Sequence, residues 1–87
     1  MAATQADKLK EILEFMEGLA RDNTFPRNVR ETIQRAKEEL LKKEEALDVK
    51  VTSAIYIIDD VVNDVNLPMH ARSELWNLVS SLEGVKK

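Results

Sequence analysis

A single histidine, His70, is the first candidate for chemistry in this chain of 87 residues, because an imidazole can act as an acid, a base or a metal ligand. It follows Pro68 by two residues, in the expected first turn of a helix, where a neutral ring can cap or pack. The chain has no cysteine, which excludes thiol catalysis, disulfides and cysteine-bearing zinc sites. Because no nucleophile, orienting acid or second ligand is spaced to serve His70, we expect no catalysis, no cofactor and no metal.

Two aspartate–arginine pairs of equal spacing are the second candidate. Asp22 precedes Arg30, and Asp64 precedes Arg72, by the same eight residues. Each aspartate closes one expected helix and each arginine lies in the first turn of the next, so an ion pair or a turn cap can form. A polar binding ledge made twice is the functional alternative. We favour structural turn pairs, since such pairs ordinarily fasten turns.

A basic stripe is the third candidate. Arg27, Arg30, Gln34 and Lys37 recur at helical spacing, and Arg21 lies just before them. A stripe of this kind is typical of surfaces that contact the phosphates of RNA. Glutamates share the same segment, and the chain has only one Trp and one Tyr to stack on bases. We favour a solvated face with local ion pairs, and keep an RNA- or ribosome-associated factor as the alternative.

An acidic patch is formed by Asp59, Asp60 and Asp64, the last two one helical turn apart. Together with Glu17, these residues supply oxygen ligands of the kind that divalent cations prefer. No loop has the spacing of an EF-hand, and isolated carboxylates on a helix surface usually stay hydrated. We therefore interpret the patch as surface.

Two aromatic residues, Trp76 and Tyr56, are the best candidates for contact with a partner protein if they are exposed, since aromatic side chains are enriched at interface hot spots. In a helical bundle of this size, aromatic residues more often belong to the core. We expect Tyr56 and Ile57 to broaden the buried face of a central helix, and Trp76 to lie at the edge of the last apolar stripe.

That central helix is expected over residues 49–65, the most apolar stretch of the chain. Its β-branched residues suggest a strand, but the run is too long for one and contains no Gly or Pro. Asp48 is the expected N-cap. Apolar residues recur at spacings of three and four, which indicates a helix: Val51, Ala54, Ile55, Ile58, Val61, Val62 and Val65.

Three further helices are predicted around it. The first begins at a capping box, Thr4–Asp7, and contains Gly18, which suggests close approach by a neighbour. The second runs from Pro26 to about Lys43, and the fourth ends at Gly84 with a frayed tail. Their apolar stripes are Leu9, Ile12, Leu13, Met16, Leu19 and Ala20; Val29, Ile33, Ala36 and Leu40; and Ala71, Leu75, Leu78, Val79 and Leu82.

The sequence repeats itself at an offset of 42 residues, which places Asp22 on Asp64 and Pro26 on Pro68. The halves span about 4–43 and 46–84, within a single helical domain over 1–87. The period is similar to that of HEAT-type hairpins, but two hairpins are too few for an open solenoid. We therefore predict an all-α fold, an antiparallel up-and-down four-helix bundle made of two repeated helical hairpins.

A family resemblance rests on the turns DNTFPRNVR (22–30) and NLPMHAR (66–72), with WNLVSSLE (76–83) after them. These segments resemble a small uncharacterised archaeal protein family of unknown function, and the resemblance covers nearly the whole chain. It implies a four-helix bundle of the bromodomain-like topological type. It implies no activity.

Composition limits the possible roles. The net charge of −3 gives no overall attraction to nucleic acid or anionic lipid, and no apolar run reaches membrane-spanning length. The N-terminal segment lacks the features of a signal peptide, so we expect a cytoplasmic protein. We expect a non-enzymatic interaction or structural module that binds a protein partner or a second copy of itself. The candidate binding residues are Arg21, Arg27, Arg30, Lys37, His70, Arg72 and Trp76.

Overall fold

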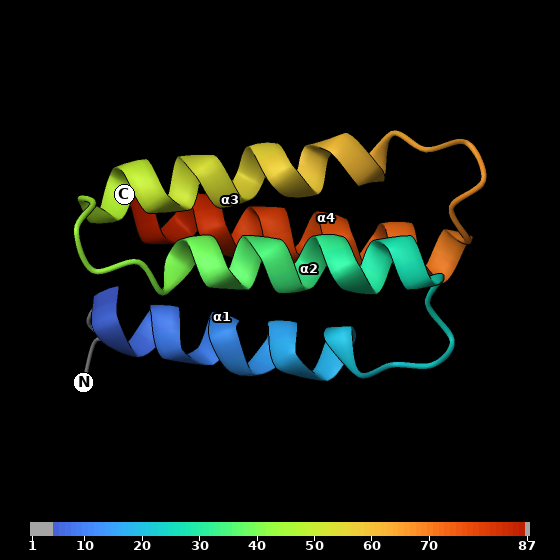
Figure 1. The fold of residues 1–87 in the computed structure, drawn as a ribbon, viewed down its shortest axis with the longest axis horizontal. Coiled ribbons are helices and arrows are strands. Elements are labelled where there is room, and N and C mark those ends of the chain that lie inside the picture. Colours follow the sequence, from blue (N-terminus) through green and yellow to red (C-terminus); the bar gives the residue numbers. More distant parts are fainter. Residues whose placement is uncertain (1–4, 87) are drawn as a thin grey trace.

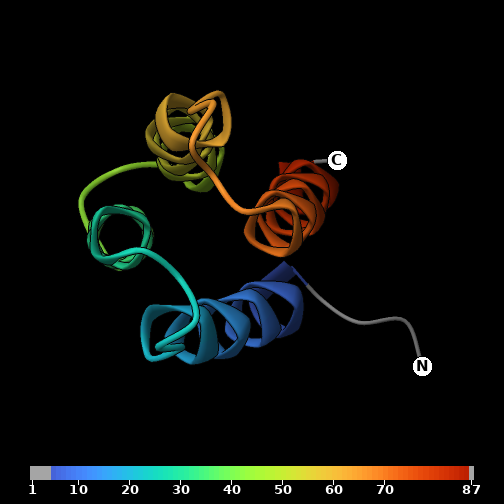
Figure 2. The same cartoon turned by 90° about the vertical axis from the view of Figure 1, so that its right-hand side faces the viewer.

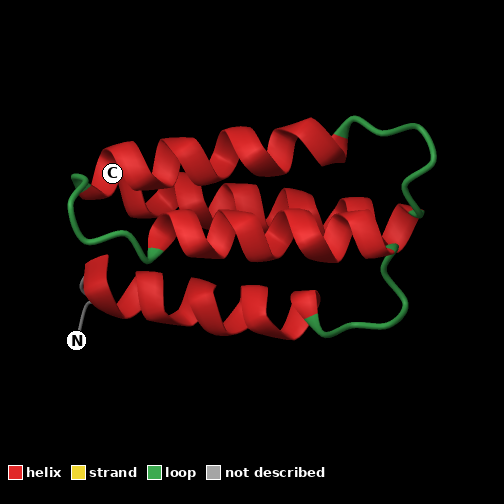
Figure 3. Ribbon diagram, in the orientation of Figure 1, coloured by secondary structure: helices red, strands yellow, loops and turns green. Residues whose placement is uncertain are grey.

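The four expected helices are present in the computed structural model, which describes residues 5–86 (Figures 1 and 3). Helix α1 spans Gln5–Ala20, α2 Arg27–Leu40, α3 Leu47–Val62 and α4 Met69–Lys86. The described residues contain no strand. The all-α four-helix prediction is therefore confirmed.

The helices run alternately up and down and occupy the corners of a square (Figures 1 and 2). Each helix packs against two neighbours, in the cycle α1–α2–α3–α4, and in the described residues the backbones of diagonal helices lie further apart. The turns 21–26 and 63–68 lie together at one end of the bundle, and the 41–46 connection lies at the other (Figure 1). This arrangement places the two halves of the sequence face to face.

The core consists of the apolar stripes that the spacing predicts. In α1 the buried residues are Ile12, Met16 and Leu19, while Leu9 and Leu13 are partly buried against them. No polar or charged residue is buried among the described side chains. All the stripe residues listed above for the second and fourth helices are buried. The largest fully buried side chains come from all four helices: Met16, Ile33, Leu40, Ile58, Leu75, Leu78 and Leu82.

The offset of 42 residues also relates the two hairpins in space. Met16 and its counterpart Ile58 are both completely buried, as are Ile33 and Leu75. The backbone of the two turns is the same as well. The amides of Phe25 and Leu67 each donate to the carbonyl of the preceding aspartate at 3.1 Å, closing identical turns.

Two of the predicted helix ends are wrong. Asp48 is not the N-cap of α3, because the extended backbone of Ala46 (φ −64°, ψ 152°) starts the helix two residues earlier than expected. Gly84 does not end α4, which continues to Lys86 because Val85, only 1% exposed, adds one more buried contact to the core. Helix α2 ends at Leu40, before Lys43, and the capping residue Thr4 lies outside the described residues.

Three predicted positions on the core face are also wrong. Tyr56 is 70% exposed, because its direction on α3 is nearly opposite to that of Ile58. Val65 is 89% exposed, since α3 has already ended at Val62 and the residue lies in the turn. Gly18 is exposed, and a Cβ built there meets nothing within 4 Å, so no neighbour approaches it closely.

Replacing Ile58 with Ala should lower the free energy of unfolding by about 2–5 kcal/mol, because the side chain is completely buried and its loss leaves a cavity. Urea denaturation monitored by circular dichroism measures the change. Ile55→Ala, at a partly buried position of the same helix, is the matched control and should cost less. A loss no larger for Ile58→Ala than for the control would contradict the packing described here.

Candidate functional site

The two predicted aspartate–arginine pairs lie at the turns 21–26 and 63–68, but neither is an ion pair in the described part of the chain. Each aspartate instead caps its turn. The Asp22 Oδ1 accepts the Thr24 amide, and the Asp64 Oδ1 accepts the Asn66 amide, both at 2.9 Å. This is the Asx-turn geometry expected of an aspartate in this position.

The two arginines differ from one another. Arg72 donates from Nη2 to the backbone carbonyl of Asp64 at 2.9 Å, and so fastens the second turn. Arg30 is half-buried, and its Nε has no hydrogen-bond partner among the described atoms. Arg72 therefore acts on its turn through the backbone, and Arg30 acts on its turn through its charge. The two arginines do not form the repeated polar binding ledge that was the functional alternative.

A hydrogen-bonded chain links the first turn to α4. The Thr24 hydroxyl donates to Asp22 Oδ1 at 2.6 Å, and its oxygen lies 3.2 Å from His70 Nε2. The imidazole also packs on Phe25, with ring centroids 5.3 Å apart. Because the hydroxyl proton is given to the carboxylate, the Thr24 oxygen accepts and the Nε2–H of His70 donates.

This order of donors does not suit nucleophilic catalysis. A catalytic hydroxyl gives its proton to an imidazole that an acid orients, whereas here the hydroxyl lies between the imidazole and the acid. The chain of contacts instead joins the two hairpins, since Thr24 belongs to the first and His70 to the second. We interpret His70 as a structural link.

The same contacts lower the pKa of Asp22 below its ordinary value. The Thr24 hydroxyl has the largest effect, its amide the next largest, and nearby His70 and Arg30 add smaller ones. A carboxyl whose pKa is lower in the folded state stabilises the protein above its unfolded-state pKa. That contribution is lost as the pH falls through the folded-state pKa.

Replacing Thr24 with Val should therefore raise the pKa of Asp22, because the hydroxyl is lost and only the amide contact remains. We expect the variant to be less stable than the wild type at neutral pH, and the difference to become smaller in acid once Asp22 is protonated in both proteins. Carboxyl NMR titration measures the pKa and urea denaturation the stability. Thr24→Ser, which keeps a hydroxyl, is the control; an unchanged Asp22 pKa in Thr24→Val would contradict this account.

The predicted basic stripe is present, but three of its four cations have local acidic partners. Arg21 pairs with Glu17 at 2.8 Å, Arg27 with Glu31 at 3.2 Å, and Lys37 with Glu17. The hydrogen bond and charge of Lys37 lower the pKa of Glu17. These contacts agree with the favoured interpretation of a solvated face with ion pairs.

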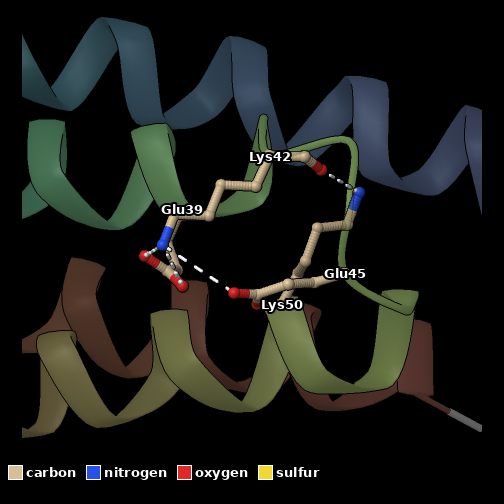
Figure 4. Close-up of polar contacts among 4 residues, drawn as sticks. All are labelled: Glu39, Lys42, Glu45 and Lys50. Atoms are coloured by element: carbon tan, nitrogen blue, oxygen red, sulfur yellow. Dashed lines mark hydrogen bonds and ion pairs between the residues drawn. The ribbon is translucent and has the colours of Figure 1, made fainter.

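Four charged residues meet beside the 41–46 connection between α2 and α3 (Figure 4): Glu39, Lys42, Glu45 and Lys50. The Lys42 Nζ lies 3.0 Å from Glu39 and 3.8 Å from Glu45, and the Glu39 carboxylate raises the pKa of this lysine. The Lys50 Nζ donates to the Lys42 carbonyl at 2.9 Å. This cluster fastens the end of α2 to the start of α3.

The contact between α4 and α1 is the equivalent place in the repeat, and its residues differ. Ser81 and Gly84 stand where the α2–α3 contact has Glu39 and Lys42. A pocket of about 410 Å³ lies here, lined by Ser81 and Gly84 of α4 and by Lys8, Glu11, Ile12 and Phe15 of α1. The sequence analysis missed Phe15, although its repeat counterpart Ile57 was expected to face the core.

The exposed large apolar side chains are unequally divided between the two hairpins. Six are exposed among the described residues, and only Leu41 lies outside the α3–α4 hairpin. We call the other five the α3–α4 outer face: Val49, Tyr56, Val65, Met69 and Trp76, which are 48–89% exposed. The sequence analysis named Trp76 and Tyr56 as partner-binding candidates if exposed, and both are exposed.

The corresponding positions of the first hairpin carry polar residues. Forty-two residues before the α3–α4 outer face stand Asp7, Glu14, Asn23, Arg27 and Gln34, which we call the α1–α2 outer face. All five of these positions are exposed. Because the two hairpins have the same backbone and the same buried stripe, the fold does not require an apolar residue at any of these positions.

Residues 5–86 were considered as a metal site and as a membrane span, and they provide neither. No three side chains of the His, Asp and Glu type come close enough there to hold a metal ion. None of the four helices combines the length and the apolar character that crossing a membrane requires, as far as the described residues extend.

The fold and these contacts define a small four-helix bundle, and comparison with known proteins gives the same class. The model of the uncharacterised protein family UPF0147 matches residues 1–85, so the chain belongs to that family. The archaeal resemblance drawn from the turns is confirmed. UPF0147 protein MJ1419 of Methanocaldococcus jannaschii is 40% identical over 83 residues, covering 95% of this chain and 89% of the relative.

Other relatives agree in sequence and in structure. A UPF0147 protein of Archaeoglobus fulgidus is 42% identical, with 88% of this chain and 87% of the relative covered. The crystal structure of MMP1188, a protein of unknown function, has a TM-score of 0.93 at 39% identity and covers 100% of this chain and 99% of its own. That of a Thermoplasma acidophilum family member has a TM-score of 0.88 at 31% identity, covering 93% and 95%. The family has no known function, so membership assigns the fold and no activity.

Proposed function

We propose that this protein is a non-catalytic interaction module that presents the α3–α4 outer face to a protein partner in the cytoplasm. The observation that carries the proposal is the difference between the two outer faces. At each of the five paired positions, the residue of the second hairpin is apolar and exposed, and the residue of the first hairpin is polar. A repeated scaffold with one apolar outer face is an arrangement suited to docking.

The identity of the exposed side chains supports this role. Trp76 is 48% and Tyr56 70% exposed, and each is the only residue of its type in the chain. Trp and Tyr are enriched at the residues that contribute most binding energy in protein interfaces. Exposed aromatic side chains lower the solubility of a protein, and neither the core nor the turns need these two residues. Their use in binding would explain why they are exposed.

Two further observations support a non-catalytic role in a reducing compartment. The Thr24 hydroxyl donates to Asp22, and the imidazole of His70 is occupied as the donor to that hydroxyl. The only acid of this hydrogen-bonded chain, Asp22, contacts the hydroxyl and does not orient the imidazole. The absence of cysteine agrees with a cytoplasmic location.

A pull-down from lysate of the source cells tests the proposal. The bait is the immobilised chain, at low and moderate salt and after nuclease treatment. We expect a protein partner that survives salt and nuclease with the wild type and is lost with Tyr56→Glu/Trp76→Gln, which gives the second hairpin the residues of the first. Glu14→Ala/Gln34→Ala, on the α1–α2 outer face, is the matched control and should keep the partner.

The RNA- or ribosome-associated alternative gives a different result in the same experiment. Recovery would then disappear with nuclease and with Arg27→Glu/Arg30→Glu, while Tyr56→Glu/Trp76→Gln would have no effect. That outcome would overturn the interaction-module proposal.

A further inference from the structure

The α3–α4 outer face is surrounded by negative charge. Asp59 and Asp60 follow Tyr56 by three and four residues, which places both within one helical turn of it. Glu83 follows Trp76 by seven residues and lies two turns further along the same face of α4. Asp60 and Glu83 are exposed and Asp59 is half-buried. Two carboxylates therefore lie within one turn of Tyr56, and a third lies about 10 Å along α4 from Trp76.

The few cations of this hairpin do not balance these carboxylates. Residues 47–86, from the start of α3 to the end of α4, contain six carboxylates and three cations. Lys50 donates to the Lys42 carbonyl beside the 41–46 connection, and Arg72 donates to the Asp64 carbonyl in its own turn. Residues 5–40, from the start of α1 to the end of α2, contain eight carboxylates and seven cations. The larger excess of negative charge thus lies on the hairpin that also carries the exposed apolar residues.

From this arrangement, and resting on the proposed function, we infer that the partner docks on the α3–α4 outer face as a basic amphipathic helix. Its aliphatic side chains contact Tyr56 and Trp76, and its lysines or arginines face Asp59, Asp60 and Glu83. Charge complementarity of this kind steers association and selects the partner.

The spacing of the apolar residues fits a helical ligand. Val49 and Tyr56 are seven residues apart on α3, and Met69 and Trp76 are seven residues apart on α4. Seven residues of helix rise about 10 Å, the length covered by anchors at positions i, i+4 and i+7 of a docked helix. Because α3 and α4 are packed neighbours, a third helix can pack against both of them.

Other occupants fit the charges less well. A symmetric dimer through this face would bring two acidic rims together, because a two-fold axis places the same patch on both sides. Nucleic acid and anionic lipid are repelled by the same carboxylates. A basic helix is the occupant that satisfies both the apolar side chains and their acidic surroundings.

Fluorescence anisotropy with three labelled peptides of 18 residues tests the inference. All three carry the same leucines at i, i+4, i+7 and i+11, and their polar faces consist of lysine, glutamine or glutamate. We expect the lysine peptide to bind about tenfold more tightly than the glutamine peptide, and the glutamate peptide not to bind. The advantage of the lysine peptide should fall with rising salt and with Asp59→Asn/Asp60→Asn.

Variants locate the binding site. Tyr56→Glu/Trp76→Gln should weaken the lysine peptide by about tenfold or more, as loss of two hot-spot aromatics requires. Glu14→Ala/Gln34→Ala should leave its affinity unchanged. All these positions are exposed, and circular dichroism with urea denaturation shows that each variant keeps its fold.

The other outcomes separate this inference from the proposed function. Equal binding of the lysine and glutamine peptides overturns the basic partner and leaves an apolar docking face. Lysine-peptide binding that survives Tyr56→Glu/Trp76→Gln places the site elsewhere and overturns both. If no peptide binds, the inference is wrong, and the pull-down alone decides the function. Sedimentation that shows a dimer lost in Tyr56→Glu/Trp76→Gln would make a second copy the occupant and overturn the basic helix.

Discussion

The structure depends on the burial of two apolar stripes against one another, because neither hairpin can bury its own. Met16 and Ile33 of the first hairpin and Ile58 and Leu75 of the second are completely buried. An isolated pair of short helices would leave these side chains in water, and helices of 14–18 residues gain most of their stability from such packing. Face-to-face closure removes the apolar surface of both halves at once. The fold follows from that constraint.

The repeat leaves the outer surfaces free to differ, since nothing in the core requires them to match. The two turns keep the same backbone hydrogen bonds, yet only the first is tied to the opposite hairpin, through Thr24 and His70. Charged residues around Lys42 fasten α2 to α3, while Ser81 and Gly84 at the equivalent place in α4 line a pocket against α1. The outer faces differ most, both in their exposed apolar residues and in their charge. The internal repeat thus provides its own comparison, in which any feature present only once is not a requirement of the fold.

The sequence predicted most of the fold because the buried apolar residues recur with the period of a helix. The stripes, the four helices and the family were all visible in spacing and turn residues. Local features were less predictable. Tyr56 and Val65 were placed on the core face because their side chains are apolar, whereas their direction depends on where α3 ends and how it is rotated. Asp48 and Gly84 are good cap residues in general, but Ala46 takes the cap by its backbone and Val85 prolongs α4 by its burial. The hydrogen bond between Thr24 and His70 joins residues 46 apart, and no local pattern contains it.

The central claim is that this scaffold uses one of its two outer faces. The most direct measurement is an amide chemical-shift map of the isotope-labelled chain during titration with the basic amphipathic peptide. The account predicts that the shifts concentrate in α3 and α4 around Tyr56 and Trp76, and that the equivalent amides near Glu14 and Gln34 stay in place. Equal shifts on both hairpins, or shifts confined to α1 and α2, would contradict it.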